Sequence, residues 1–116
     1  MNNYKELKVW MKAIDLSVKA YEISRTFPQT ELFGLITQIQ RAAVSIAANI
    51  SEGAGRNSDK EFVHFLGISN GSAYELNTHL VISNRIGYLS NEDYAEMSQR
   101  LDEIEKMLNA LMKSKS

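Results

Sequence analysis

The sequence predicts an all-α protein that folds as an antiparallel, up-down-up-down four-helix bundle. Apolar residues recur three and four positions apart along four stretches, which is the periodicity of amphipathic α-helices. Short segments with Pro, Gly or a helix-capping residue separate the stretches, and such connections favour antiparallel neighbours. A chain of 116 residues is the size of one domain, so the bundle should occupy residues 1–116. The expected helices cover residues 5–26, 30–53, 58–86 and 91–112, followed by a frayed tail at 113–116.

The composition is that of an ordinary soluble domain and narrows the possible functions. Apolar residues make up 44% and charged residues 23% of the chain, and the net charge of -1 provides no overall basic field for nucleic acid, although it is compatible with a local patch. Without cysteine there is no disulfide, thiol nucleophile or Cys-type zinc site. The first residues are too polar for a secretory signal, and no apolar run approaches the roughly 18 residues that span a bilayer. We therefore expect a cytoplasmic protein with no membrane partner and no cofactor.

The first predicted helix, which should end near Phe27-Pro28, carries two apolar rows on nearly opposite faces. One row consists of Leu7, Met11, Ile14, Val18 and Tyr21, and the other of Val9, Ala13, Leu16, Ala20 and Ile23. A helix packed on one side needs a single apolar row, so the second should be covered by another copy of the chain. The expected interface between copies consists of Val9, Trp10, Ala13, Leu16, Ala20 and Ile23.

The second predicted helix begins at a Thr30 cap and ends at Gly53-Ala54-Gly55. Its residues 38–53, QIQRAAVSIAANISEG, are small or apolar on most of the helix surface, as in a helix that is buried almost all round. One polar row interrupts this surface and consists of Gln38, Arg41, Ser45, Asn49 and Glu52. This segment is the part of the chain that the other helices have to fit around.

The polar row has two interpretations. In the structural one, Arg41 pairs with a carboxylate of the facing helix such as Glu75, while Ser45 and Asn49 form hydrogen bonds across the interface and fix the register. In the functional one, the row is a polar floor that binds a ligand or nucleic acid.

Helix-capping patterns mark the starts of the last two helices. Ser58-Asp59-Lys60-Glu61 is a capping box, and Gly87 closes the third helix. Ser90 caps the fourth helix, whose first turn holds acidic residues. The apolar seam of this helix is Tyr94, Met97, Leu101, Ile104, Leu108 and Leu111. Its remaining faces are charged, so the fourth helix should lie on the outside of the bundle.

Several segments together resemble one protein family. They are Leu7-Lys8-Val9-Trp10, Phe27-Pro28, Glu31 with Gly34-Leu35, residues 38–53, Gly55-Arg56, Phe62 with Phe65-Leu66, and Gly71-Ser72 with Glu75-Leu76. The family is the four-helix-bundle family named for proteins encoded in intervening sequences of bacterial 23S ribosomal RNA genes, and its relatives include the accessory variability determinant of diversity-generating retroelements. The resemblance implies a left-handed bundle that assembles as a homopentamer and binds structured RNA or DNA. The chain departs from the basic relatives in its slight acidity, in Asn70 where many carry a basic residue, and in Ser69 where alanine is usual.

The basic residues suggest how nucleic acid would bind. The first 27 residues have a formal charge of +2, whereas the chain from Tyr88 onward has -2. In one interpretation Lys8, Lys12, Lys19, Arg56 and Lys60 contact phosphates, and a ring of copies multiplies the contact. In the other these residues belong to an ordinary solvated face.

Other possible sites have simpler explanations. Glu75 and His79 are four residues apart, but a zinc site needs three or four ligands. His64 is expected at the surface. The segment 53–56 lacks the strand and the Lys-Ser/Thr signature of a phosphate loop. Arg56 and Lys60, near the capped start of the third helix, remain an anion-binding candidate. No catalytic constellation is present.

The sequence therefore favours a non-enzymatic, homo-oligomeric protein that binds structured RNA or DNA through a multivalent basic surface. The alternative is an adaptor whose partner is another polypeptide, in which case an apolar patch would remain exposed on the assembled oligomer. A small enzyme is the third possibility and would require a deep polar pocket with perturbed carboxylates.

Overall fold

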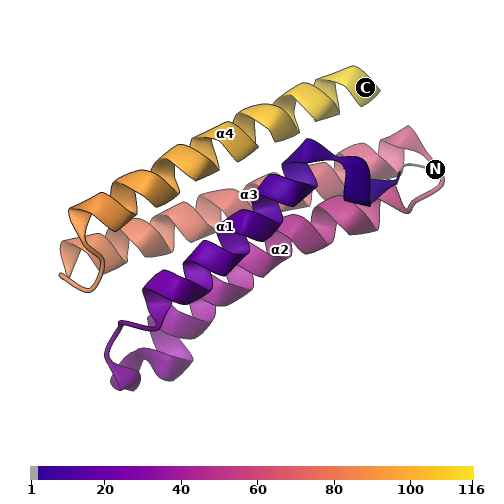
Figure 1. The fold of residues 1–116 in the computed structure, drawn as a ribbon. Coiled ribbons are helices and arrows are strands. Elements are labelled where there is room, and N and C mark those ends of the chain that lie inside the picture. The colour runs from indigo at the N-terminus through magenta and orange to yellow at the C-terminus, as the bar shows by residue number, and fades with distance from the viewer. Residues whose placement is uncertain (1–2) are drawn as a thin grey trace.

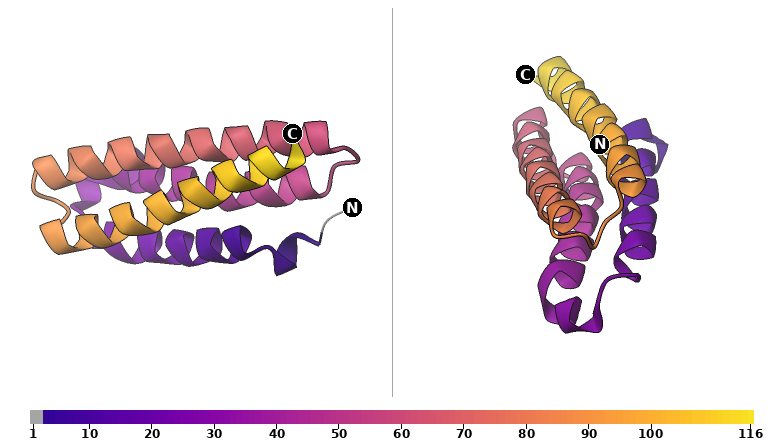
Figure 2. Two further views of the ribbon diagram at one scale, coloured as in Figure 1. Left: turned by 90° about the horizontal axis from the view of Figure 1, so that it is seen from above. Right: turned by 90° about the vertical axis from the view of Figure 1, so that its left-hand side faces the viewer.

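Four α-helices that run in alternating directions form the protein in a computed structural model, which describes residues 3–116 (Figure 1). The helices are α1 (Lys8–Ser24), α2 (Thr37–Ala54), α3 (Asp59–Arg85) and α4 (Asn91–Lys115). Within residues 3–116 there is no strand, and the predicted all-α bundle is confirmed. The described chain begins at the end of the molecule where the α2–α3 turn and the C-terminus also lie, and the other two turns lie at the opposite end (Figure 2).

The predicted helix boundaries nearest the two ends of the chain are wrong. The chain forms a 3-10 turn at Tyr4–Glu6, and Leu7 is extended with φ -73° and ψ 122°, so α1 begins at Lys8. At the other terminus α4 continues to Lys115 instead of fraying, because Leu111 and Met112 still pack against the core. The lysines in this last turn also carry the favourable charge for a helix C-terminus.

The connection between α1 and α2 is more irregular than the predicted Thr30 cap implied. A 3-10 turn at Gln29–Glu31 leads into a π-helical turn at Leu32–Ile36, where Gly34 leaves helical geometry. Glu31 supplies the cap, since its Oε1 accepts a hydrogen bond from the Leu35 amide at 3.2 Å. This turn projects Phe33 outward, with 90% of the side chain exposed.

The other predicted helix ends are confirmed. The Ser58 and Ser90 hydroxyls accept hydrogen bonds from the amides of Glu61 and Asp93, each at 3.1 Å. Gly87 ends α3 with φ +90°, and the chain then turns back so that the amides of Tyr88 and Leu89 both donate to the Ser83 carbonyl.

Small residues allow α2 to lie close to both of its neighbours. The Ser17 hydroxyl of α1 donates to the Ala43 carbonyl at 3.1 Å, and the Ser69 hydroxyl of α3 donates to the Ile46 carbonyl at 2.8 Å. Such contacts between a short side chain and a neighbouring backbone require close helices. The buried face of α2 is accordingly rich in alanine, with Ala42, Ala43, Ala47 and Ala54 among its buried residues.

Gly53 provides the tightest test of this packing. A Cβ atom added at Gly53 would lie 2.7 Å from the Phe65 Cβ and 3.2 Å from the Phe62 carbonyl oxygen. Gly53→Ala should therefore destabilise the fold by about 1–2 kcal/mol, because this overpacking outweighs the helix propensity that alanine gains. Urea unfolding followed by circular dichroism measures the change. Gly55→Ala is the matched control, since its Cβ would meet atoms only at 3.6 Å and beyond; equal stability of both variants would contradict the close approach.

Candidate interaction surface

The two apolar rows of α1 are confirmed as distinct faces, but the row assigned to an interface between copies was the wrong one. Val9, Ala13, Leu16, Ala20 and Ile23 are each 4% exposed or less and belong to the protein's own core. The other row points outward and is exposed at Met11, Ile14, Val18 and Tyr21. Both rows share the same periodicity, so the sequence pattern alone does not distinguish them. The alanines at 13 and 20 are the signal that could have done so, because small residues suit the closely packed side.

Trp10, also assigned to the interface, lies between these two environments. The side chain is half-buried, packs against the edge of the core and meets the Tyr4 ring edge-on with centroids 5.2 Å apart. Its exposed part faces the same side of the molecule as Ile14, since both line one hollow.

The exposed large apolar side chains are confined to three of the four helices and to their turns. Besides the outward row of α1, they are Leu32, Phe33, Val44, Ile68, Tyr74, Ile82 and Ile86. They therefore come from α1, α2, α3 and adjoining turns, and none comes from α4, which is described over its whole length. Where exposed apolar residues gather into a patch on a globular protein, they mark an interaction site.

Three of these residues, Ile14, Tyr21 and Val44, line a groove along α1 and α2, which we call the α1/α2 groove. Two hollows of about 290 and 470 Å³ form it, and Val44 lines both. The lining residues are Tyr4, Trp10, Ile14, Ser17, Tyr21, Thr37, Gln40, Arg41, Val44, Ser45, Ala47, Ala48 and Ser51. Arg41 is the sole charged residue among them. Aromatic residues, an arginine and few other charges are the composition found at the centre of protein–protein interfaces.

The polar row of α2 has mixed partners. The Ser45 hydroxyl meets the Ser72 hydroxyl of α3 at 2.8 Å, so this predicted contact across the helix interface forms. Asn49 does not cross to α3 but donates to the Ser45 carbonyl and hydroxyl at 2.8 and 3.0 Å. Gln38, at the start of the row, is exposed.

The predicted pair between Arg41 and Glu75 does not form within the chain. Arg41 is exposed and has no ion-pair partner among residues 3–116. Glu75 instead lies 3.6 Å from His79 Nε2, one turn further along α3, and 55% of its side chain is exposed. The two opposite charges are thus both left accessible at the surface.

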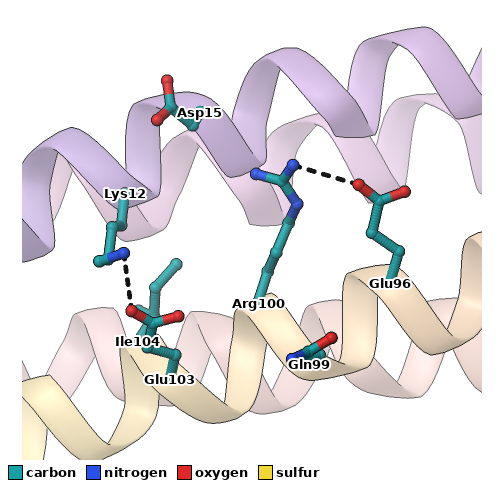
Figure 3. A pocket seen from close by; sticks show the side chains of 7 residues that line it. All are labelled: Lys12, Asp15, Glu96, Gln99, Arg100, Glu103 and Ile104. Atoms are coloured by element: carbon teal, nitrogen blue, oxygen red, sulfur yellow. Dashed lines mark hydrogen bonds and ion pairs between the residues drawn. The ribbon is translucent and has the colours of Figure 1, made fainter.

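The surface between α1 and α4 is charged around Lys12, Lys19 and Arg100. Its polar cleft of about 310 Å³ is lined by side chains from both helices (Figure 3). Lys12 pairs with Glu103 at 2.6 Å, and Glu96 accepts from Lys19 at 3.2 Å and from Arg100 at 3.1 Å. The hydrogen bonds from Arg100 and Lys19 hold the pKa of Glu96 below its ordinary value. This cleft joins the two helices through ion pairs and exposes no large apolar residue.

The five cations expected to contact phosphates do not form one patch. Lys12 and Lys19 face the α4 carboxylates. Arg56 pairs with Glu52 at 2.6 Å and lies 4.8 Å above the Phe65 ring. Lys8 and Lys60 are exposed and have no ion pair among the described residues. They lie at the end of the bundle that also holds the C-terminus (Figures 1 and 2).

The remaining candidates have structural roles. Gly53 and Ala54 lie within the last turn of α2, so segment 53–56 ends a helix, and the His64 ring packs edge-on against Phe65. Across residues 3–116, no group of three or more His, Cys, Asp or Glu residues is arranged to hold a metal. None of the described helices combines the length and the apolarity required to cross a membrane.

The fold and the surface together define a small four-helix bundle with a charged cleft between α1 and α4 and a largely apolar groove along α1 and α2. The chain belongs to the 23S rRNA-intervening sequence protein family, whose model matches residues 5–110. It is similar to the crystal structure of a protein of unknown function from the S23 ribosomal protein family of Bacteroides thetaiotaomicron, with a TM-score of 0.84 and 29% identity. That match covers 90% of this chain and 98% of the other. No curated protein matches the chain.

The ion pairs of Glu96 predict a pH dependence. Because the folded-state pKa of Glu96 is lowered, its stabilisation is present above the unfolded-state pKa of about 4.3 and is lost as the pH falls through the folded-state pKa. Glu96→Gln should therefore lower the urea midpoint near neutral pH, and the difference from the wild type should vanish in acid. Glu6→Gln is the control, since Glu6 is exposed and unpaired within residues 3–116. A difference that grows on acidification would show that these ion pairs do not stabilise the fold.

Proposed function

We propose that this protein is a non-enzymatic module that assembles into a closed homo-oligomer and presents a repeated basic surface to structured RNA or DNA. The observation that carries the proposal is the restriction of exposed large apolar side chains to α1, α2, α3 and their turns. A monomer would leave this surface in water, whereas association removes it from water at about 25 cal/mol per Å² of apolar area.

A closed ring, in which every copy makes the same contact with the next, fits the distribution of the exposed apolar residues. The exposed apolar side chains extend over three helices rather than forming one small self-complementary patch. Two different patches that bind each other around a rotation axis generate a ring. The family resemblance gives five as the expected number of copies. The charged helix α4 would remain in solvent on each copy.

A ring would also bring basic residues together. Lysines and arginines at the end of the bundle that holds both described termini are Lys5, Lys8, Arg56, Lys60, Lys113 and Lys115. The carboxylates from the same segments are Glu6, Glu52, Asp59 and Glu61, and Glu52 is already paired with Arg56. Rotation about a ring axis along the bundle repeats this net positive end on one face of the assembly, where several weak phosphate contacts act together.

The assembly predicts the mass in solution. Light scattering should give several times the mass of one chain for the wild type, and Val18→Glu should lower this mass, because it places a charge in the apolar surface. Val18 is 55% exposed, so the fold of each copy should persist, as circular dichroism can verify. Gln99→Glu on the exposed surface of α4 is the matched control and should leave the mass unchanged. A wild type with the mass of a single chain would refute the assembly.

The basic end predicts salt-dependent binding. Labelled structured RNA, titrated with the wild type at low and high salt, should bind more weakly at high salt, with each phosphate contact contributing about 0.9 to the slope of log K against log salt. The double variant Lys8→Glu/Lys60→Glu should bind more weakly and with a shallower slope. Arg25→Glu, at the opposite end of the bundle, is the control.

Two results would contradict the nucleic-acid role. One is the absence of salt-sensitive binding at micromolar protein. The other is a pull-down from native lysate in which a polypeptide partner persists after nuclease treatment, which would favour the protein adaptor.

A further inference from the structure

The geometry points to one specific contact: α3 of one copy docks into the α1/α2 groove of the next copy, with Glu75 of the docking helix beside Arg41 of the groove. The partner is therefore a second copy of this chain. The inference rests on the homo-oligomer proposed above and identifies the two surfaces that would meet in it.

The outward stripe of α3 is shaped for close contact with another helix. Ile68 and Ile82 are exposed on it, and Glu75 lies midway between them. Gly71 lies on this stripe and Gly67 at its edge, and a Cβ added to either would meet nothing within 4 Å. Glycine within a helix costs about 1 kcal/mol relative to alanine, and no contact within the described chain requires it at these positions. A helix of another copy that approaches the α3 backbone would require it.

The charges on the two surfaces are complementary. Arg41 is the sole charged residue that lines the α1/α2 groove, and it has no ion-pair partner among residues 3–116. Glu75 is the acidic residue at the middle of the α3 stripe, and its side chain is half exposed beside His79. Covering the groove would bury Arg41, and burial of an unpaired charge is costly, so the occupant has to supply a carboxylate.

The register of α2 against α3 within one chain determines where Arg41 and Glu75 lie along the axis of the bundle. The hydrogen bond between Ser45 and Ser72 places these residues at one level of the antiparallel helices α2 and α3. Arg41 is four residues before Ser45 and Glu75 is three residues after Ser72, so both lie in the same direction from that level, at about 6 and 4.5 Å. Rotation about a ring axis parallel to the bundle preserves height. Arg41 of one copy and Glu75 of the next are therefore level.

The apolar residues match in the same register. Ile68 is seven residues before Glu75 along α3, and Ala48 is seven residues after Arg41 along the antiparallel α2, so each lies about 10 Å from its charge toward the α2–α3 turn. Ile68 thus comes level with the hollow that Trp10 and Ala48 line. In the opposite direction Ile82 comes level with the turn that exposes Leu32 and Phe33.

Charge reversal tests the contact. Arg41→Glu and Glu75→Arg should each raise the dissociation constant of the assembly at least about tenfold, because each places like charges together, and the double variant should regain most of the loss. An equal mixture of the two single variants should recover part of the assembly as rings that contain both chains, because every contact between unlike copies joins opposite charges, although a ring of five retains at least one contact between like copies. Lys106→Glu, an exposed charge reversal on α4, is the control. Analytical ultracentrifugation measures each constant.

A second variant separates docking from folding. Gly71→Leu has free space around it in the single chain, so it should keep or raise the thermal stability of each copy while it blocks assembly. Ala95→Leu, at an exposed position of α4, should leave assembly intact. If the wild type is oligomeric but Gly71→Leu and both charge reversals assemble normally, this contact is wrong and the homo-oligomer stands. A monomeric wild type would instead refute the proposed assembly itself.

Discussion

The structure depends on the close approach of α2 to both α1 and α3. This approach is possible because the buried side of α2 carries alanines and ends in Gly53, whose α-carbon lies against the Phe62 and Phe65 side of α3. Short serine side chains then reach the backbone of α2 from both neighbours. With α2 fixed in this way, the outer surfaces of α1 and α2 lie side by side, and Ile14, Tyr21 and Val44 line one groove between them.

Much of this fold is predictable from the sequence, and the limits have physical causes. Caps at Ser58 and Ser90 and the turn at Gly87 are local, because the groups that form them lie within a few residues. The continuation of α4 to Lys115 is not local, since it depends on contacts of Leu111 and Met112 with distant parts of the chain. The same limit explains the error on α1: periodicity identifies two apolar rows, and the packing of other helices decides which one is buried.

The candidate surface was harder to predict than the fold. Which cations are free and which glycines are exposed depends on how the helices pack, and the sequence does not show this directly. Lys12 and Lys19 are basic in the sequence, but the packing of α4 against α1 brings Glu103 and Glu96 to them and removes them from any phosphate surface. Conversely, nothing in the sequence around Gly67 and Gly71 shows that these glycines face outward. Their exposure on a helix is informative only after the bundle shows that no neighbour within the chain occupies that space.

The polar row of α2 combines the structural role and the binding role that the sequence left open as alternatives. Its inner members have structural partners, because Ser45 meets Ser72 and Asn49 bonds to Ser45 within α2. Arg41, further along the same row, has no such partner in the described chain, although a carboxylate of α3 lies at nearly the same height. In the proposed ring the serine contact would set the register within each copy, and this register would then align Arg41 with the next copy's Glu75. The register of α2 against α3 within one protomer would thus determine whether Arg41 and Glu75 of neighbouring protomers meet. A shift in that register would also prevent assembly.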